Sequence, residues 1–139
     1  MANFLALEQF DVLATDFNWY SRNFSSTSLT SGSISFGGSS YNDFYVINGQ
    51  QGSISRQLQI YGSGFSFSPA IVGTVSAAAE LDRSTGQYNW TVTNISVPLV
   101  GLYNAISTSQ NSDDLAAIAV ILAGNDIITL SAFLSLIHI

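Results

Sequence analysis

The stretch YNDFYVINGQQGSISRQLQIYGSGFSF, residues 41–67, decides the fold class. Residues 44–47 form a compact apolar run that ends at Asn48-Gly49, a pair that favours a tight hairpin. In residues 54–67 apolar and polar side chains alternate with the period of a strand. Gly62-Ser63-Gly64 is not followed by a helix start, so it indicates a bulge or a bend and not a phosphate-binding loop. Consecutive strands of an antiparallel sheet are therefore predicted.

The same pattern extends outward from this stretch on both sides. Apolar residues alternate with polar ones in residues 25–36, 71–77 and 88–95. Turn signals separate these runs at Gly37-Gly38 and in the polar segment 82–87. A β meander of about five or six strands follows from these turn signals.

Helical spacing replaces the period of two after Pro98. We predict a first helix directly after this proline. A second helix is better marked, because Asn111 or Ser112 can cap it and Asp113-Asp114 places negative charge at its start. Gly124 is a plausible stop for that helix, since glycine adopts a left-handed conformation easily.

The start of the chain is less regular. Apolar residues recur at steps of three and four in residues 4–17, which indicates a short amphipathic helix or a loosely packed arm. The sum of these segments is an α+β domain. It consists of an antiparallel β meander or sandwich-like sheet with a C-terminal helical hairpin.

Composition excludes several classes of function. The chain has 139 residues, of which 47% are hydrophobic, enough for one domain with a real core. Three arginines, no lysine and nine carboxylates make the net charge −6, so nucleic acid is a poor partner and divalent cations are a natural one. There is no cysteine, so disulfides and thiol chemistry are excluded. We predict no membrane span.

No catalytic constellation emerges. The only histidine is His138, so a Ser-His-Asp triad has no credible centre. The carboxylate pair Asp113 and Asp114 is simply read as a helix start, and the pair Glu80 and Asp82 as a strand end or turn. We therefore predict that the chain is not an enzyme.

One segment resembles a known family. In residues 122–130, LAGNDIITL, the positions Gly124, Asn125, Asp126 and Ile128 are similar to the nonapeptide repeats of RTX-type, haemolysin-type calcium-binding proteins. The same triplet also fits a helix stop followed by a turn. The resemblance implies Asn125 and Asp126 as the first metal ligands, with calcium bound only when downstream repeats complete the oxygen cage.

The resemblance also implies an origin and a role. The chain would be a bacterial protein secreted by type I secretion without an N-terminal signal peptide. Residues 1–123 would form its N-terminal structural or interaction module, and 124–133 the start of a calcium repeat. Residues 134–139, LSLIHI, match a translated sequencing adapter, which predicts that the native chain continues after Phe133.

A second hypothesis is a small-ligand carrier. The strand-rich body followed by a helix also looks like the α+β fold of secreted haem carriers. Tyr41, Tyr45 and Tyr61 are the candidate haem ligands in this alternative, because a phenolate can bind ferric iron. Large aromatic residues in a β meander are otherwise most often core residues.

Overall fold

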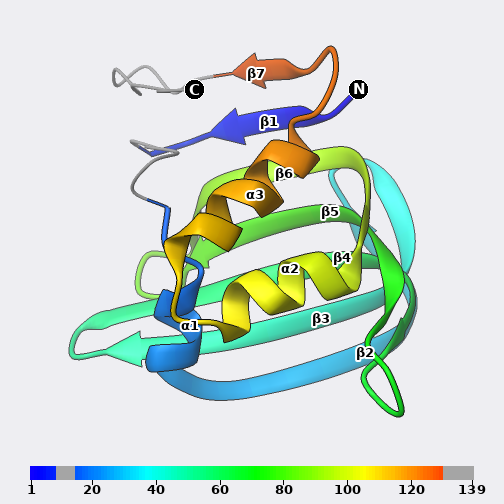
Figure 1. The fold of residues 1–139 in the computed structure, drawn as a ribbon. Helices are drawn as coiled ribbons and strands as arrows, with labels where there is room; N and C mark the ends of the chain where they lie inside the picture. The colour runs from blue at the N-terminus through cyan, green and yellow to red at the C-terminus, as the bar shows by residue number, and fades with distance from the viewer. Residues whose placement is uncertain (9–14, 130–139) are drawn as a thin grey trace.

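The computed structural model describes residues 1–8 and 15–129. A single seven-stranded sheet has the strand order β2-β3-β4-β5-β6-β1-β7, and the helices α2 and α3 lie across one of its faces (Figure 1). The predicted α+β class is confirmed. The strands are β1 (Asn3–Ala6), β2 (Phe24–Phe36), β3 (Ser39–Gln51), β4 (Ile54–Ser66), β5 (Val72–Asp82), β6 (Gln87–Pro98) and β7 (Ile127–Thr129); the helices are α1 (Asn18–Arg22), α2 (Leu99–Ser107) and α3 (Asn111–Ile121).

Strands β2 to β6 form the predicted meander, in which each strand pairs antiparallel with the next. The turns at Gly37-Gly38 and in residues 83–86 lie where the sequence places them. The predicted bulge is also present, since the register of β4 and β5 shifts after Tyr61 and again after Ser63. A Cβ at Gly62 would lie 1.9 Å from the Thr74 carbonyl oxygen, so only glycine fits this close approach.

The prediction of a tight hairpin at Asn48-Gly49 is wrong. These residues pair inside β3, opposite Gln57 and Arg56, and the chain turns four residues later at Gly52-Ser53. The reason is tertiary contact. A Cβ at Gly49 would lie 2.5 Å from Cζ3 of Trp19, so this glycine makes room for an indole packed on the sheet.

The amphipathic helix predicted near the N-terminus is wrong for residues 3–6, which form β1. This strand pairs antiparallel with β6, with Phe4 opposite Val92. Phe4 and Ala6 are buried while their neighbours are half-buried, so the period is two where the sequence suggested three to four. Residues 9–14 of the predicted segment lie outside the described residues.

Both predicted helices are present, with one change in capping. The residue before α3 is Gln110, and no side chain caps the helix, so neither Asn111 nor Ser112 has the expected role. Asp113 and Asp114 do lie in its first turn, as predicted. Among the described residues, no helix has the length and apolar character needed to cross a membrane.

The sequence predicts the helical hairpin as the last element of the domain, but one more element follows it. Strand β7 follows α3 and returns to the sheet, where it pairs parallel with β1. The first and last strands of the described chain, β1 and β7, therefore lie side by side (Figure 1). The predicted repeat start, residues 124–133, is described only as far as Thr129, and the predicted adapter-derived tail, residues 134–139, lies outside the described residues.

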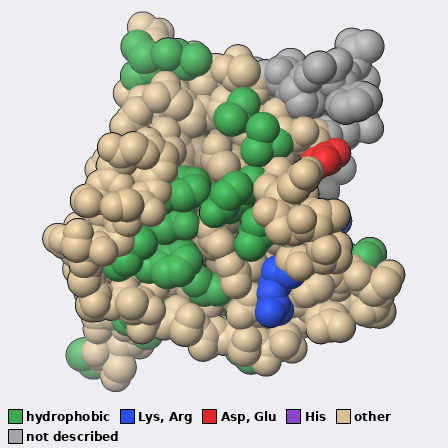
Figure 2. Space-filling model, turned by 180° about the vertical axis from the view of Figure 1, so that it is seen from behind, with side chains coloured by type: hydrophobic (Ala, Val, Ile, Leu, Met, Phe, Trp, Pro, Cys, Tyr) green, Lys and Arg blue, Asp and Glu red, His purple; other side chains and the backbone are tan. Residues whose placement is uncertain are grey.

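The core has two parts. The main cluster lies between the sheet and the helices and includes the fully buried Leu58, Ile60 and Leu99. A smaller cluster contains Tyr41, Tyr61 and Ala77, with Ile34, Phe36 and Phe44 packed against it. Figure 2 views the molecule from behind and shows hydrophobic side chains gathered in the middle of that face. Both clusters bury apolar surface, and this burial is the main contribution to the free energy of folding in a chain without disulfides.

Candidate functional site

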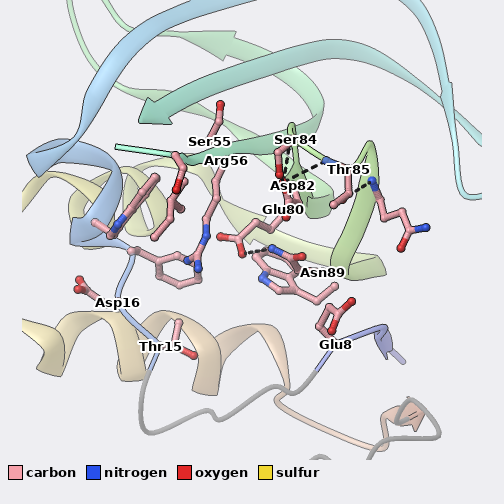
Figure 3. Close-up of a pocket in the computed structure, with 16 residues that line it drawn as sticks. Glu8, Thr15, Asp16, Ser55, Arg56, Glu80, Asp82, Ser84, Thr85 and Asn89 are labelled. Carbon is pink, nitrogen blue, oxygen red and sulfur yellow. Dashed lines mark hydrogen bonds between the residues drawn. The ribbon is translucent and has the colours of Figure 1, made fainter. Parts of the chain in front are cut away.

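A groove lies where α1, the start of β4 and the β5–β6 hairpin meet. Its volume is about 960 Å³. Figure 3 shows the side chains of Arg56, Glu80 and Asn89 directed toward its middle, with Asp82 in the hairpin beside them. Strand pairing explains this convergence, because Arg56 is opposite Asp82 across β4 and β5, and Glu80 is opposite Trp90 across β5 and β6.

Glu80 is held by two hydrogen bonds. The Tyr20 hydroxyl donates to Glu80 Oε2 at 2.6 Å, and the Asn89 amide nitrogen donates to Oε1 at 2.9 Å. Burial and the neighbouring Glu80 carboxylate raise the pKa of Tyr20 well above its ordinary value. Glu80 therefore connects α1 to the sheet, a link between residues 60 positions apart.

Asp82 and Arg56 are two of the charged residues that line the groove. Asp82 Oδ1 accepts the Ser84 hydroxyl at 2.5 Å and the Ser84 backbone N–H at 2.8 Å. These bonds lower the pKa of Asp82, the hydroxyl being the larger cause. The Arg56 guanidinium carbon lies 5.2 Å from the centre of the Trp19 ring, a cation–π arrangement.

The hydrogen bonds of Glu80 and Asp82 hold neighbouring side chains of the groove in place. Both Glu80 oxygens accept hydrogen bonds, and Asp82 Oδ1 accepts a hydrogen bond from the Ser84 hydroxyl in the turn after β5. The local sequence pattern predicts the turn role of Asp82 but gives no sign of the role of Glu80. Only the long-range contact with Tyr20 defines it, and no local pattern encodes that contact.

The predicted metal ligands, Asn125 and Asp126, lie directly before β7 and are not among the residues that line the groove. Asn125 is exposed, and Asp126 is half-buried just before β7. Asp126 Oδ1 accepts the Ala2 backbone N–H at 2.8 Å, while its Oδ2 is buried without a hydrogen-bond partner among the described residues. Within residues 1–8 and 15–129, no three His, Cys, Asp or Glu side chains are grouped as a metal site. Calcium binding through these two residues stays a prediction.

The three candidate haem ligands are divided between the two clusters. Tyr41 and Tyr61 belong to the smaller cluster, with ring centres 5.5 Å apart. Tyr45 belongs to the main core, where its ring centre lies 4.5 Å from that of Phe67. The Tyr61 hydroxyl donates to Gln59 Oε1 at 2.7 Å, and burial raises its pKa. The haem hypothesis stays a prediction, tested by a Soret shift on mixing with hemin.

The chain was also compared with known proteins. No family model matches it. Neither a curated protein nor a solved structure shows a significant match. Function is therefore inferred from the residues and their geometry.

Proposed function

We propose that the chain is a non-catalytic N-terminal module of a secreted calcium-binding repeat protein, and that its role is to start the folding of the repeats that follow. The observation that carries this is the parallel pairing of β7 with β1, in which Phe4 is opposite Ile128. Every other strand pair of the described sheet is antiparallel.

The segment that resembles a calcium repeat is the one that forms this parallel pair. Ile128 packs against the main core, as the inward aliphatic residue of a repeat would. Calcium-binding nonapeptide repeats stack as parallel strands, so a parallel strand at the end of a sheet is a suitable first rung. Strand β7 is the last strand of the described sheet on this side.

Asp126 supports the junction in two ways. Its Oδ1 receives the Ala2 N–H, and the Ile127 backbone N–H donates to the Ala2 carbonyl oxygen at 2.9 Å, so the first residues of the chain hold the start of β7. Its Oδ2 has no hydrogen-bond partner in the described part of the chain. A carboxylate oxygen of this kind is a hard ligand that calcium prefers, once further oxygens are supplied.

The groove supports a non-catalytic role. A general acid or base needs an oxygen that can reach a substrate proton. Both Glu80 oxygens accept hydrogen bonds, from Tyr20 and Asn89, and Asp82 Oδ1 accepts the Ser84 hydroxyl of the turn after β5, so these atoms hold side chains of the groove itself.

The experiment is to extend the chain after Thr129 with calcium-binding nonapeptide repeats and to follow repeat folding by circular dichroism during a calcium titration. We expect the repeats to fold at a lower calcium concentration on this module than alone. Ile127→Pro should remove the gain, since proline lacks the N–H that Ile127 donates to the Ala2 carbonyl oxygen of the β1 end, whereas Ile127→Val should keep it. Equal calcium dependence for all three chains would contradict the proposal.

A further inference from the structure

Strand β2 is an unusually open sheet edge. It runs over 13 residues, Phe24–Phe36, and among the described residues it pairs with β3 alone. Ten consecutive residues from Phe24 are exposed, so neither face of the strand is covered over this length. A long edge strand of this kind presents a row of unpaired backbone N–H and C=O groups to a further strand.

The usual protection of such an edge is weak here. Natural proteins place lysine, proline or inward-pointing charges on edge strands. Residues 23–42 contain none of these residue types in a chain whose net charge is −6. Two large apolar side chains are exposed on β2 instead, Phe24 at 57% and Leu29 at 43%.

The regular part of the edge is shorter than the strand. Register shifts lie between Phe24 and Ser26 and between Ser31 and Ile34, so the longest unbroken pairing with β3 runs from Ser26 to Ser31. A bulge limits the pairing of an edge to the flat segment beside it. Six residues of strand extend about 20 Å, which predicts a small and weak interface.

We propose that β2 is a self-association edge, on which a second copy of this chain pairs antiparallel through Ser26–Ser31 and joins two sheets into one. Charge permits this partner. Both copies bring the same uncharged, Ser/Thr-rich strand to the pair, so no like charges are opposed along the edge. This edge lies at the opposite end of the sheet from β7, so self-association leaves the repeat junction free.

The first test is sedimentation velocity over a concentration series from about 10 µM to about 1 mM, a range suited to an interface this small. We expect the sedimentation coefficient of the unmodified chain to rise toward that of a dimer. Ser28→Lys places positive charges close together at the centre of the paired segment and should keep the chain monomeric. Ser109→Lys changes net charge equally at an exposed site between α2 and α3 and should still associate.

The second test uses the absence of native cysteine. Four single variants locate the two-fold axis of the paired strands: Thr27→Cys, Ser28→Cys, Leu29→Cys and Thr30→Cys. Only the residue that lies opposite its own copy has the short Cβ separation that a disulfide needs. We expect one position to cross-link far faster than its neighbours and than Ser109→Cys. A monomer at every concentration, or equal cross-linking at all positions, would overturn the proposal.

Discussion

Asp43 in β3 and Asp114 in α3 are both buried aspartates, exposed by 7% and 0%, yet their surroundings shift the pKa in opposite directions. Asp43 accepts the Ser31 hydroxyl on one oxygen at 2.7 Å and the Phe65 N–H on the other at 3.0 Å. Asp114 accepts the Phe17 N–H and the Asn18 amide on Oδ2, and its Oδ1 has no partner among the described residues.

Hydrogen bonding decides the difference. Donors to both oxygens, the Phe65 N–H first, lower the pKa of Asp43. Burial raises the pKa of Asp114 to about 6, aided by the nearby Asp113 and Asp16 and opposed by the Phe17 N–H and by Arg22. A buried carboxylate is thus stabilised as an anion only where donors reach both oxygens.

Each aspartate also has a structural position that explains its donors. Asp43 lies where β2 and β4 both lose regular pairing, after Ser31 and after Ser63, and it receives the Phe65 N–H that the interrupted ladder leaves without a strand partner. Asp114 lies where the first turn of α3 meets the start of α1. The first compensates for two bulges, and the second joins two helices.

The largest expected effect is at Asp43. Asp43→Ala leaves the Phe65 N–H and the Ser31 hydroxyl without their acceptor, so the free energy of unfolding should fall by about 3 kcal/mol. Asp43→Asn keeps one acceptor oxygen and should lose about half as much. Urea unfolding at neutral pH measures both. Equal stability of the alanine variant and the unmodified chain would show that the two bonds contribute nothing net.

The second prediction concerns pH and Asp114. Its folded pKa of about 6 lies above the ordinary value of 3.8, so the stability that its protonated form contributes is complete below about pH 3.8 and lost as pH rises through 6. We expect the free energy of unfolding to fall by about 2 kcal/mol between pH 4 and pH 7. Asp114→Asn should remove that slope. Asp43 has the opposite effect on the pH dependence. Because its pKa is lowered, the stability that it contributes is lost as pH drops below about 4.

A smaller effect is expected at Gly49, which connects β3 to α1 through Trp19. Gly49→Ala brings a methyl group to 2.5 Å from Cζ3 of that indole, which must move. The loss should be about 1 kcal/mol, with a change in tryptophan fluorescence. Gly52→Ala is the matched comparison, since its Cβ meets no atom within 4 Å but its φ of 59° is unfavourable for alanine. It should destabilise without changing the fluorescence.

The smallest expected effect is the coupling between Asp43 and Asp114 in the free energy of unfolding. Asp43 and Asp114 share no hydrogen-bond partner in the described structure, so the changes in unfolding free energy of Asp43→Asn and Asp114→Asn should add within about 0.5 kcal/mol. A double-mutant cycle measures this. A larger coupling would mean that the strand region and the helix region unfold as one tightly linked unit.

The local pattern was sufficient for the meander and both later helices. Alternation in residues 25–36, 54–67 and 88–95 predicted β2, β4 and β6; β4 and β6 are partly buried, as that period implies, whereas the first ten residues of β2 are exposed. It was insufficient for β1 and β7. Residues 3–6 and 127–129 are too short for a period to be distinguished. β1 is a strand because it pairs with β6 and β7, and β7 is a strand because it pairs with β1.

By itself, the sequence determined the α+β class, the order of the meander strands, the two helices after Pro98 and the acidic, cysteine-free surface. These properties depend on composition and on neighbours within a few residues. Only the tertiary structure decided the turn at Gly52-Ser53, the return of β7 to β1, and the opposite pKa shifts of Asp43 and Asp114. Each of these depends on a partner distant in sequence, such as Trp19, Ala2 or Phe17, whose approach is set by packing and not by any local period.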